Sequence, residues 1–143
     1  MTLTDKDRQL LLLLGENARM STAMLARKLG LSRTTVQTKI ERLERDGIIT
    51  GYGVRLSEAY ESGLVKAHVL ITLKAKMLGR VTQQLQAIEN VSSVHSVSGS
   101  FDMIAMVAAV SISELDRVID KIGEIDGVEK TLSSIILSTR IDR

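Results

Sequence analysis

The segment STAMLARKLGLSRTTVQTKIERLERDG, residues 21–47, has the pattern of two amphipathic helices that follow each other closely. Ser21 is a residue type typical of a helix N-cap, and Gly30 is typical of the position that ends a helix. Ser32 then begins a second helix, which is predicted to extend to about Asp46. Two short helices joined by a turn that contains a glycine predict a helix-turn-helix.

The neighbouring segments complete this domain on both sides. Thr4 is followed three residues later by Asp7, which is the spacing of a capped helix start. Apolar residues then recur at helical intervals, so a first helix is expected over about residues 5–17. Residues 48–56 (IITGYGVRL) are expected to form a wing-like strand. The sequence thus predicts a winged helix-turn-helix domain over residues 1–56.

The third helix of this domain separates an apolar stripe from a polar face. Val36, Ile40 and Leu43 recur at the spacing of one buried helix face. On the polar face, Arg and Gln side chains can form paired hydrogen bonds with guanine and adenine, and threonine methyl groups can contact thymine. A solvated face without a partner is the alternative. The candidate DNA-binding residues are Ser32, Arg33, Thr34, Thr35, Gln37, Thr38, Lys39, Arg42 and Arg45, of which the last three, with Arg27 and Lys28, are expected to contact phosphates.

Charge is distributed unevenly along the chain. Residues 1–56 contain 10 Lys and Arg against 6 Asp and Glu, a net charge of +4, whereas residues 57–143 contain 9 against 11, a net charge of −2. The positive first part suits contact with double-stranded DNA. The absence of cysteine excludes disulfides, and two isolated histidines, His68 and His95, cannot form a structural zinc site, so both are interpreted as structural. No metal or cofactor is expected.

The chain carries no sign of a membrane or secretory protein. No apolar run approaches the roughly 18 residues of a membrane span. The N-terminal sequence MTLTDKDRQ also lacks the basic-then-apolar order of a signal peptide. A cytoplasmic protein without a membrane partner is therefore expected. Small domains without disulfides or metals usually depend on partner subunits, which favours a homo-oligomer.

The second part of the chain contains an internal repeat. After residues 57–64, which are expected to form a hinge, strand–helix–strand patterns occur twice over residues 65–143. Two such units in succession predict a ferredoxin-like βαββαβ domain, and the whole chain is assigned to the α+β class. Strands are expected at about 65–74, 93–98, 101–110 and 129–138. The repeated positions are Leu78, Val81, Leu85, Ile88 and Val91, which return 37 residues later as Leu115, Val118, Ile122, Ile125 and Val128.

The predicted sheet is expected to pack against a second copy of itself. Residues 103–110 (MIAMVAAV) are apolar on both alternating faces, and helices can cover only one face. RNA-binding domains of the same topology expose aromatic residues that stack on bases. This chain has only Tyr52, Tyr60 and Phe101, so an RNA-binding sheet is excluded.

A short polar hairpin follows the second predicted strand, and it is a candidate ligand site. Gly99 frees backbone amides to meet a carboxylate, and Asp102 can meet an ammonium group. The alternative is a tight turn in which Asp102 only accepts hydrogen bonds from neighbouring backbone amides. The candidate effector-binding residues are Ser98, Gly99, Ser100, Phe101 and Asp102, with Thr131, Ser133 and Ser134, although a half-exposed strand would carry the last three anyway.

As a connected series, these motifs resemble the Lrp/AsnC family of prokaryotic transcription factors. The matching segments include residues 17–21 (NARMS), 30–32 (GLS) and 47–52 (GIITGY), and residues 98–102 resemble the Gly-x-aromatic-Asp signature of the family's RAM domain. The resemblance implies a regulator that forms a homodimer, assembles to a tetramer or octamer, and holds a small effector, commonly an amino acid, at this hairpin between dimers. Met24 departs from the family, which usually has Glu there.

Two functions are alternatives to a ligand-responsive DNA-binding regulator. A protein of the same architecture that organises DNA by oligomerising, without any effector, would show the same motifs. An enzyme would need reactive groups, and the chain contains no cysteine, no Ser/His/Asp set and no glycine loop that could hold phosphates. The sequence therefore predicts no enzyme activity, and it leaves the choice between the two kinds of DNA-binding protein open.

Overall fold

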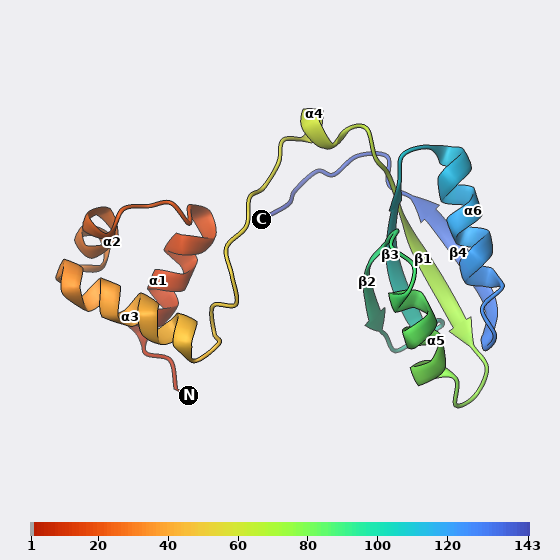
Figure 1. The fold of residues 1–143 in the computed structure, drawn as a ribbon, viewed down its shortest axis with the longest axis horizontal. Coiled ribbons are helices and arrows are strands. Elements are labelled where there is room, and N and C mark those ends of the chain that lie inside the picture. Colours follow the sequence, from red (N-terminus) through yellow and green to blue (C-terminus); the bar gives the residue numbers. More distant parts are fainter. Residues whose placement is uncertain (1) are drawn as a thin grey trace. The chain divides into compact units, whose positions relative to one another are not determined.

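The computed structural model describes residues 2–143 and divides the chain after Arg55 into two compact units (Figure 1). Each unit has its own apolar core. The first unit contains three helices, α1 (Asp5–Glu16), α2 (Thr22–Leu29) and α3 (Arg33–Arg45).

Side chains at the helix starts explain where these helices begin. Thr4 and Asp7 form a reciprocal cap at the start of α1. Ser21 Oγ accepts a hydrogen bond from Met24 N at 3.1 Å, so α2 is capped although it lacks the glutamate that would reciprocate. Gly30 has φ 68°, the left-handed conformation that ends a helix, and it sets α2 and α3 apart.

The core of the first unit lies where α2 packs against both α1 and α3. Leu10, Leu25 and Leu29 meet Val36 and Leu43 there, and all five side chains are buried. The apolar stripe predicted for α3 is therefore the face that α3 turns to the core.

The strand predicted over residues 48–56 is not formed. The amides of Ile48 and Ile49 both donate to Leu43 O, at 2.9 and 3.0 Å, and close the end of α3 instead. No helix or strand includes residues 50–56, and within the described chain they have no neighbouring strand with which to form a ladder. Arg55 Nη2 donates to Glu16 O at 2.7 Å, which attaches this segment to the end of α1.

The second unit is a four-stranded antiparallel sheet with two helices on one face. The strand order is β2-β3-β1-β4, as expected for two βαβ halves. One turn of helix, α4 (Glu58–Glu61), lies within the predicted hinge. The remaining elements are β1 (Val65–Leu73), α5 (Leu78–Gln86), β2 (Val91–Ser96), β3 (Met103–Ala109), α6 (Ile112–Gly123) and β4 (Val128–Ile135).

The core of the second unit lies between the sheet and its two helices. Alternate residues of β1 and β3 are buried, among them Val69 and Val107. The repeated positions of the two helices meet them, because Leu85 of α5 and Ile122 of α6 have no exposed surface. The sequence repeat is thus a repeat of core contacts, and the predicted α+β fold is confirmed.

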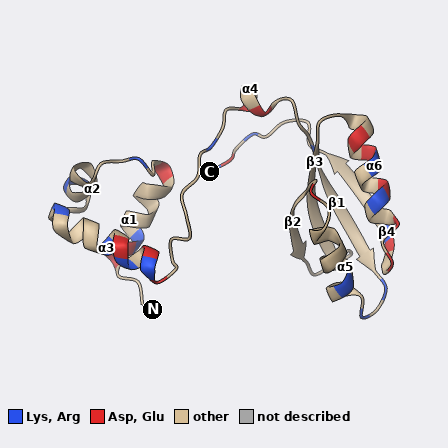
Figure 2. Ribbon diagram, in the orientation of Figure 1, with Lys and Arg blue, Asp and Glu red and all other residues tan. Residues whose placement is uncertain are grey.

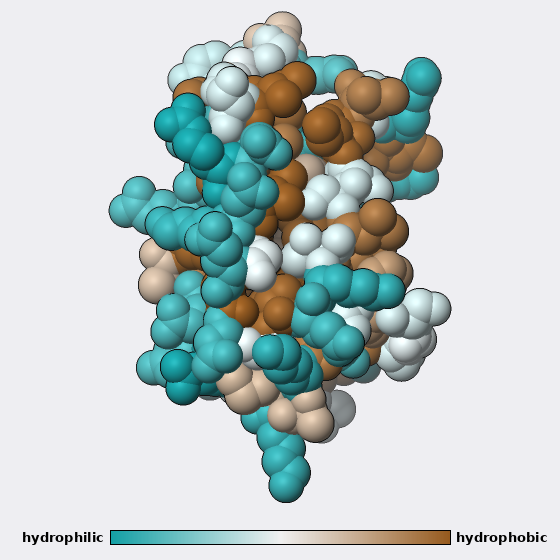
Figure 3. Space-filling view, turned by 90° about the vertical axis from the view of Figure 1, so that its right-hand side faces the viewer, coloured by the Kyte–Doolittle hydropathy of each residue, from teal (hydrophilic) through white to brown (hydrophobic). Residues whose placement is uncertain are grey.

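The other face of the sheet carries an apolar centre that no described element of the unit covers. Leu70 of β1 lies between Ile104 of β3 and Leu132 of β4 in the strand register. His68 lies one register step away, between Met106 and Ser134. Figure 3 shows the side of the molecule that is at the right of Figure 1, where hydrophobic residues reach the surface between hydrophilic ones. None of the helices within residues 2–143 has the length and apolar character needed to cross a membrane.

Candidate DNA interface and ligand pocket

The exposed face of α3 carries most of the residues predicted to read DNA. Arg33, Thr34 and Thr38 are exposed and lie away from the buried stripe. Gln37 is also exposed, and its Nε2 donates to Glu41 Oε1 at 3.0 Å, one helical turn further along. This contact holds the amide of Gln37 in a defined direction at the surface.

Two of the predicted contact residues serve the start of the helix. Ser32 Oγ accepts a hydrogen bond from Thr35 N at 3.1 Å, and the two hydroxyl oxygens lie 2.8 Å apart. Ser32 is therefore the N-cap of α3, and Thr35 is tied to it. The remaining amides of the first turn stay free of helical partners, and the positive end of the helix dipole favours anions there.

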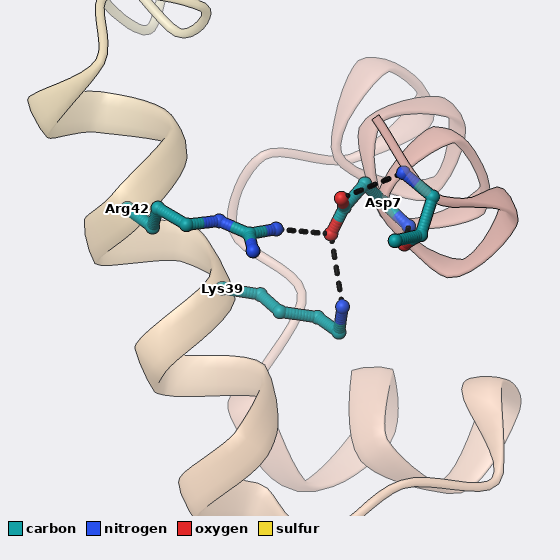
Figure 4. Close-up of polar contacts among 4 residues, drawn as sticks. Asp7, Lys39 and Arg42 are labelled. Carbon is teal, nitrogen blue, oxygen red and sulfur yellow. Dashed lines mark hydrogen bonds and ion pairs between the residues drawn. The ribbon is translucent and has the colours of Figure 1, made fainter. Parts of the chain in front are cut away.

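Lys39 and Arg42 were predicted to contact phosphates, and in the structure both side chains form ion pairs with Asp7. Lys39 Nζ lies 2.9 Å and Arg42 Nη2 lies 2.7 Å from Asp7 Oδ1 (Figure 4). The exposed fractions of these side chains are 17% for Lys39, 34% for Arg42 and 0% for Asp7. Sequence analysis missed this contact because Asp7 lies on another helix, more than thirty residues away.

Asp7 stays ionised in spite of its burial. Burial raises its pKa, but a hydrogen bond from the Thr4 backbone and the contact with Lys39 lower it by more. The result is a pKa of about 2, against an ordinary value of 3.8. A carboxylate that would cost free energy on its own is thus stabilised by two cations and a helix cap.

The other cations that were predicted to contact phosphates lie at the ends of α2 and α3. The side chain of Arg45 is 73% exposed and only approaches Asp46, with 3.8 Å between Nε and Oδ1. Arg27 and Lys28 are exposed in the last turn of α2. Figure 2 shows Lys and Arg in blue on both helices.

The hairpin between β2 and β3 is anchored to β1 by Asp102. Asp102 Oδ2 accepts a hydrogen bond from Leu73 N at 2.7 Å, and Asp102 N donates to Ile71 O at 2.9 Å. Gly99 has φ 114°, a conformation that other residue types rarely adopt. The sequence suggested that Asp102 either contacts a ligand or accepts hydrogen bonds from neighbouring backbone amides. Its hydrogen bond with Leu73 was not predicted, because Leu73 is distant in the sequence and lies on another strand.

A hollow of about 280 Å³ lies beside this hairpin. Asp102 contributes an acidic group to its wall, and Lys74 and Lys76 contribute basic groups. Neither lysine was predicted from the sequence; in the structure Lys76 has φ 64°, a conformation that is strained for a residue other than glycine. The lining residues are Leu73, Lys74, Ala75, Lys76, Met77, Leu78, Ser96, Val97 and Asp102.

The other predicted effector residues are spread over several places. Ser98 and Ser100 are exposed in the hairpin, and Phe101 is half-buried. On β4, Thr131 pairs with Ile71 and Ser133 with Val69, on the side of the sheet that faces the helices, whereas Ser134 pairs with His68 on the uncovered face. Within one chain, the three β4 residues do not converge on the hairpin.

A larger hollow, of about 370 Å³, lies between α4 and the C-terminal segment. Its wall contains Glu61 and Lys66, which pair with each other at 3.4 Å. Its other charged lining residues are Glu58, Arg140 and Asp142. His68 and His95 lie on strands, and no group of metal ligands exists within residues 2–143.

Both parts of the chain match known protein families. Residues 66–143 match the Lrp/AsnC ligand binding domain, and residues 3–50 match a winged helix-turn-helix DNA-binding domain. The transcriptional regulator LrpA of Pyrococcus horikoshii is 31% identical over 134 residues, which is 93% of this chain and 95% of LrpA.

Solved structures of the same architecture are also similar to this chain. Escherichia coli AsnC has a TM-score of 0.88 and 30% identity, and the match covers 100% of this chain and 97% of AsnC. A transcriptional regulator of Neisseria meningitidis, solved in complex with L-Met, has a TM-score of 0.86. The match covers 99% of this chain and 94% of the Neisseria chain, with 22% sequence identity. At this low identity, the likeness shows a shared fold alone.

Proposed function

The chain belongs to the Lrp/AsnC family of transcriptional regulators, which are not enzymes, and from that premise we propose that it reads a near-palindromic DNA site as a dimer or larger assembly under the control of an amino-acid effector. The exposed face of α3 carries this proposal. It presents Arg33 and Gln37 to the surroundings while the opposite face is buried in the core.

The uncovered face of the sheet supports a dimer. Its centre consists of Leu70, Ile104, Met106 and Leu132, and covering it with the same face of a second chain removes apolar area from water. A two-fold dimer presents two copies of α3, which fit half-sites separated by one or more helical turns of DNA.

The hollow beside the hairpin supports a zwitterionic effector. Lys74 and Lys76 suit a carboxylate, while the second oxygen of Asp102 suits an ammonium group. The L-Met complex of the Neisseria regulator, which shares this fold, is in keeping with an amino acid. An effector that prefers one arrangement of dimers shifts the population toward it, and so changes the spacing of the DNA-reading helices.

The DNA reading is tested by selecting duplexes from a random library with the wild-type chain. Arg33→Ala and Gln37→Ala should each weaken binding of the selected duplex by about tenfold or more, and should change binding of a scrambled duplex far less. Arg45→Ala serves as the comparison, because the loss of a phosphate contact weakens both duplexes alike. Equal losses for all three variants on both duplexes would contradict base reading by α3.

The effector is tested by thermal unfolding with each of the twenty amino acids. A ligand that binds the folded chain raises the melting temperature, by an amount set by its concentration relative to its Kd. No shift with any amino acid would favour the alternative of a DNA-organising protein that needs no effector. Sedimentation with and without the active amino acid then measures whether the assembly changes.

A further inference from the structure

Asp7 connects α1 to the helix that is proposed to read DNA. We propose that Asp7 is a positioning residue: it holds Lys39 and Arg42 against α1, which fixes the rotation of α3 and keeps both cations away from DNA phosphates. This inference rests on the proposed function, because it assigns a role in the same DNA-reading surface.

The anchor itself is rigid. Asp7 Oδ2 accepts a hydrogen bond from Thr4 N at 2.9 Å, and Asp7 N donates to Thr4 Oγ1 at 3.1 Å. The other oxygen, Oδ1, receives both cations. Each oxygen of the carboxylate thus has its own partners, and the side chain cannot turn away without breaking the cap of α1. Figure 4 shows Lys39 and Arg42 converging on this one carboxylate.

The two cations lie on one flank of α3. Lys39 and Arg42 are three residues apart, so their side chains leave the same side of the helix. The spacing of 3.6 residues per turn puts Arg33 and Gln37 on the other flank, across the stripe of Val36. A link on one flank resists rotation of α3 about its axis, and this rotation would change the direction in which Arg33 and Gln37 point.

The fold maintains this arrangement at a cost. Arg42 Nε is buried and has no hydrogen-bond partner among the described residues. An unpaired buried N–H is unfavourable, and an arginine that faced water would avoid it. The arrangement pairs the charges of Lys39 and Arg42 with Asp7, so that Arg45, Arg27 and Lys28 remain for phosphates.

The first test is Asp7→Asn in the full chain, with Asp5→Asn as the matched control. Asp5 lies in the same first turn, has an exposed side chain and contacts only Arg8. Affinities are measured at several salt concentrations for the duplex that the wild type selects and for a scrambled duplex of equal length. Asp7→Asn should lower the ratio of the two affinities by about tenfold. It should also steepen the salt dependence by about one phosphate contact for each released cation.

Each outcome of this first test decides the role of Asp7. Asp5→Asn carries the same charge change and should leave both quantities near their wild-type values. Equal losses on both duplexes, with an unchanged salt slope, would overturn the proposal, because they are the result expected if Asp7 only stabilises the fold.

The second test remains decisive if Asp7→Asn does not fold. Lys39→Gln leaves Asp7 paired with Arg42, and it should leave the salt slope on the scrambled duplex unchanged. Arg45→Gln should flatten that slope by about one phosphate contact. If both variants flatten it equally, Lys39 already contacts phosphate and the proposal fails. A wild type that selects no sequence would contradict the proposed function, while this comparison on scrambled DNA would still decide whether Lys39 is withheld.

Discussion

Single residues near the proposed DNA-binding face also take part in contacts that hold the first unit together. Asp7 is fully buried, yet its pKa is lowered to about 2, because hydrogen bonds and cations outweigh the effect of burial. Gln37 reaches the surface, yet its amide is held by Glu41. At this scale, the proposed recognition of DNA would gain from side chains that already have partners before DNA arrives.

The lowered pKa of Asp7 predicts how stability depends on pH. The folded chain binds the proton less tightly than the unfolded chain, so the contribution of Asp7 is complete above about pH 4 and is lost as the pH falls toward 2. The lowering from 3.8 to about 2 corresponds to about 2 kcal/mol. Asp7→Asn should therefore destabilise the first unit by about this amount at pH 6 and much less near pH 2.

Urea unfolding, followed by the NMR resonances of α1, α2 and α3, measures this difference at each pH. Asp5→Asn should show no comparable dependence, because Asp5 is exposed. A constant difference between wild type and Asp7→Asn from pH 6 to pH 2 would show that the carboxylate charge is not what stabilises this contact.

Asp102 is expected to affect the response to effector more than the affinity for DNA. Asp102→Asn keeps an oxygen that can accept the hydrogen bond from Leu73 N but removes the charge that meets an ammonium group. The thermal shift caused by the active amino acid should therefore be largely lost, while DNA binding without effector stays within about twofold of the wild type. A full thermal shift in the variant would exclude Asp102 as a ligand contact.

Site residues could be predicted from the sequence only where the evidence lies in neighbouring residues of the same element. The polar face of α3 follows from the spacing of Val36, Ile40 and Leu43. The ion pairs of Lys39 and Arg42 could not be predicted, because they depend on how α3 packs relative to α1. Lys74 and Lys76 were missed for the same reason: only the fold brings their loop beside the hairpin.

At the scale of elements, helices were easier to predict than strands. A helix makes its hydrogen bonds within itself, and its caps and apolar period are written in adjacent residues. A strand needs a partner, so the apolar run at Ile48 and Ile49 could not by itself establish a wing. In the second unit the strands have partners, and the 37-residue repeat indicated both halves of the sheet correctly.

The turn before β4 is a place where one added methyl group should disrupt packing. Gly127 has φ 106°, and a Cβ there would lie 2.8 Å from Met77 Cβ and 3.0 Å from Val81 Cγ2. Gly127→Ala should therefore destabilise the second unit by about 2–4 kcal/mol, through backbone strain and crowding together. Calorimetry or circular dichroism, followed through thermal unfolding, measures the effect.

Gly79 in α5 provides the matched control. A Cβ at Gly79 would meet nothing within 4 Å, and alanine is the better helix former. Gly79→Ala should raise stability by about 0.5–1 kcal/mol. Equal effects of the two substitutions would mean that the contact between the turn and α5 is looser than the structure indicates.

At the scale of the whole molecule, the uncovered face of the sheet is the surface that we propose pairs two chains. Leu132 is 55% exposed on β4, the edge strand of the sheet, where it pairs with Leu70 on that face. In a two-fold dimer, Leu132→Asp places a charge from each chain in an apolar interface, so the dimer Kd should rise by about a hundredfold or more. Analytical ultracentrifugation of the wild type and the variant measures this change.

Ile112→Asp is the control for that experiment. Ile112 is 63% exposed at the start of α6, away from the sheet face, and an acidic residue suits a helix start. This variant should assemble like the wild type. A wild type that stays monomeric at micromolar concentration would contradict the proposed dimer, whereas unchanged assembly of Leu132→Asp would place the interface elsewhere.

Residues 50–56 are exposed and belong to no helix or strand, which has a practical consequence for anyone who purifies this protein. An exposed, extended main chain is the shape that a protease must draw into its catalytic cleft. Brief digestion should cut there first and release two fragments, each of which keeps its own core. The same segment is therefore a natural point at which to exchange one fragment for that of another regulator.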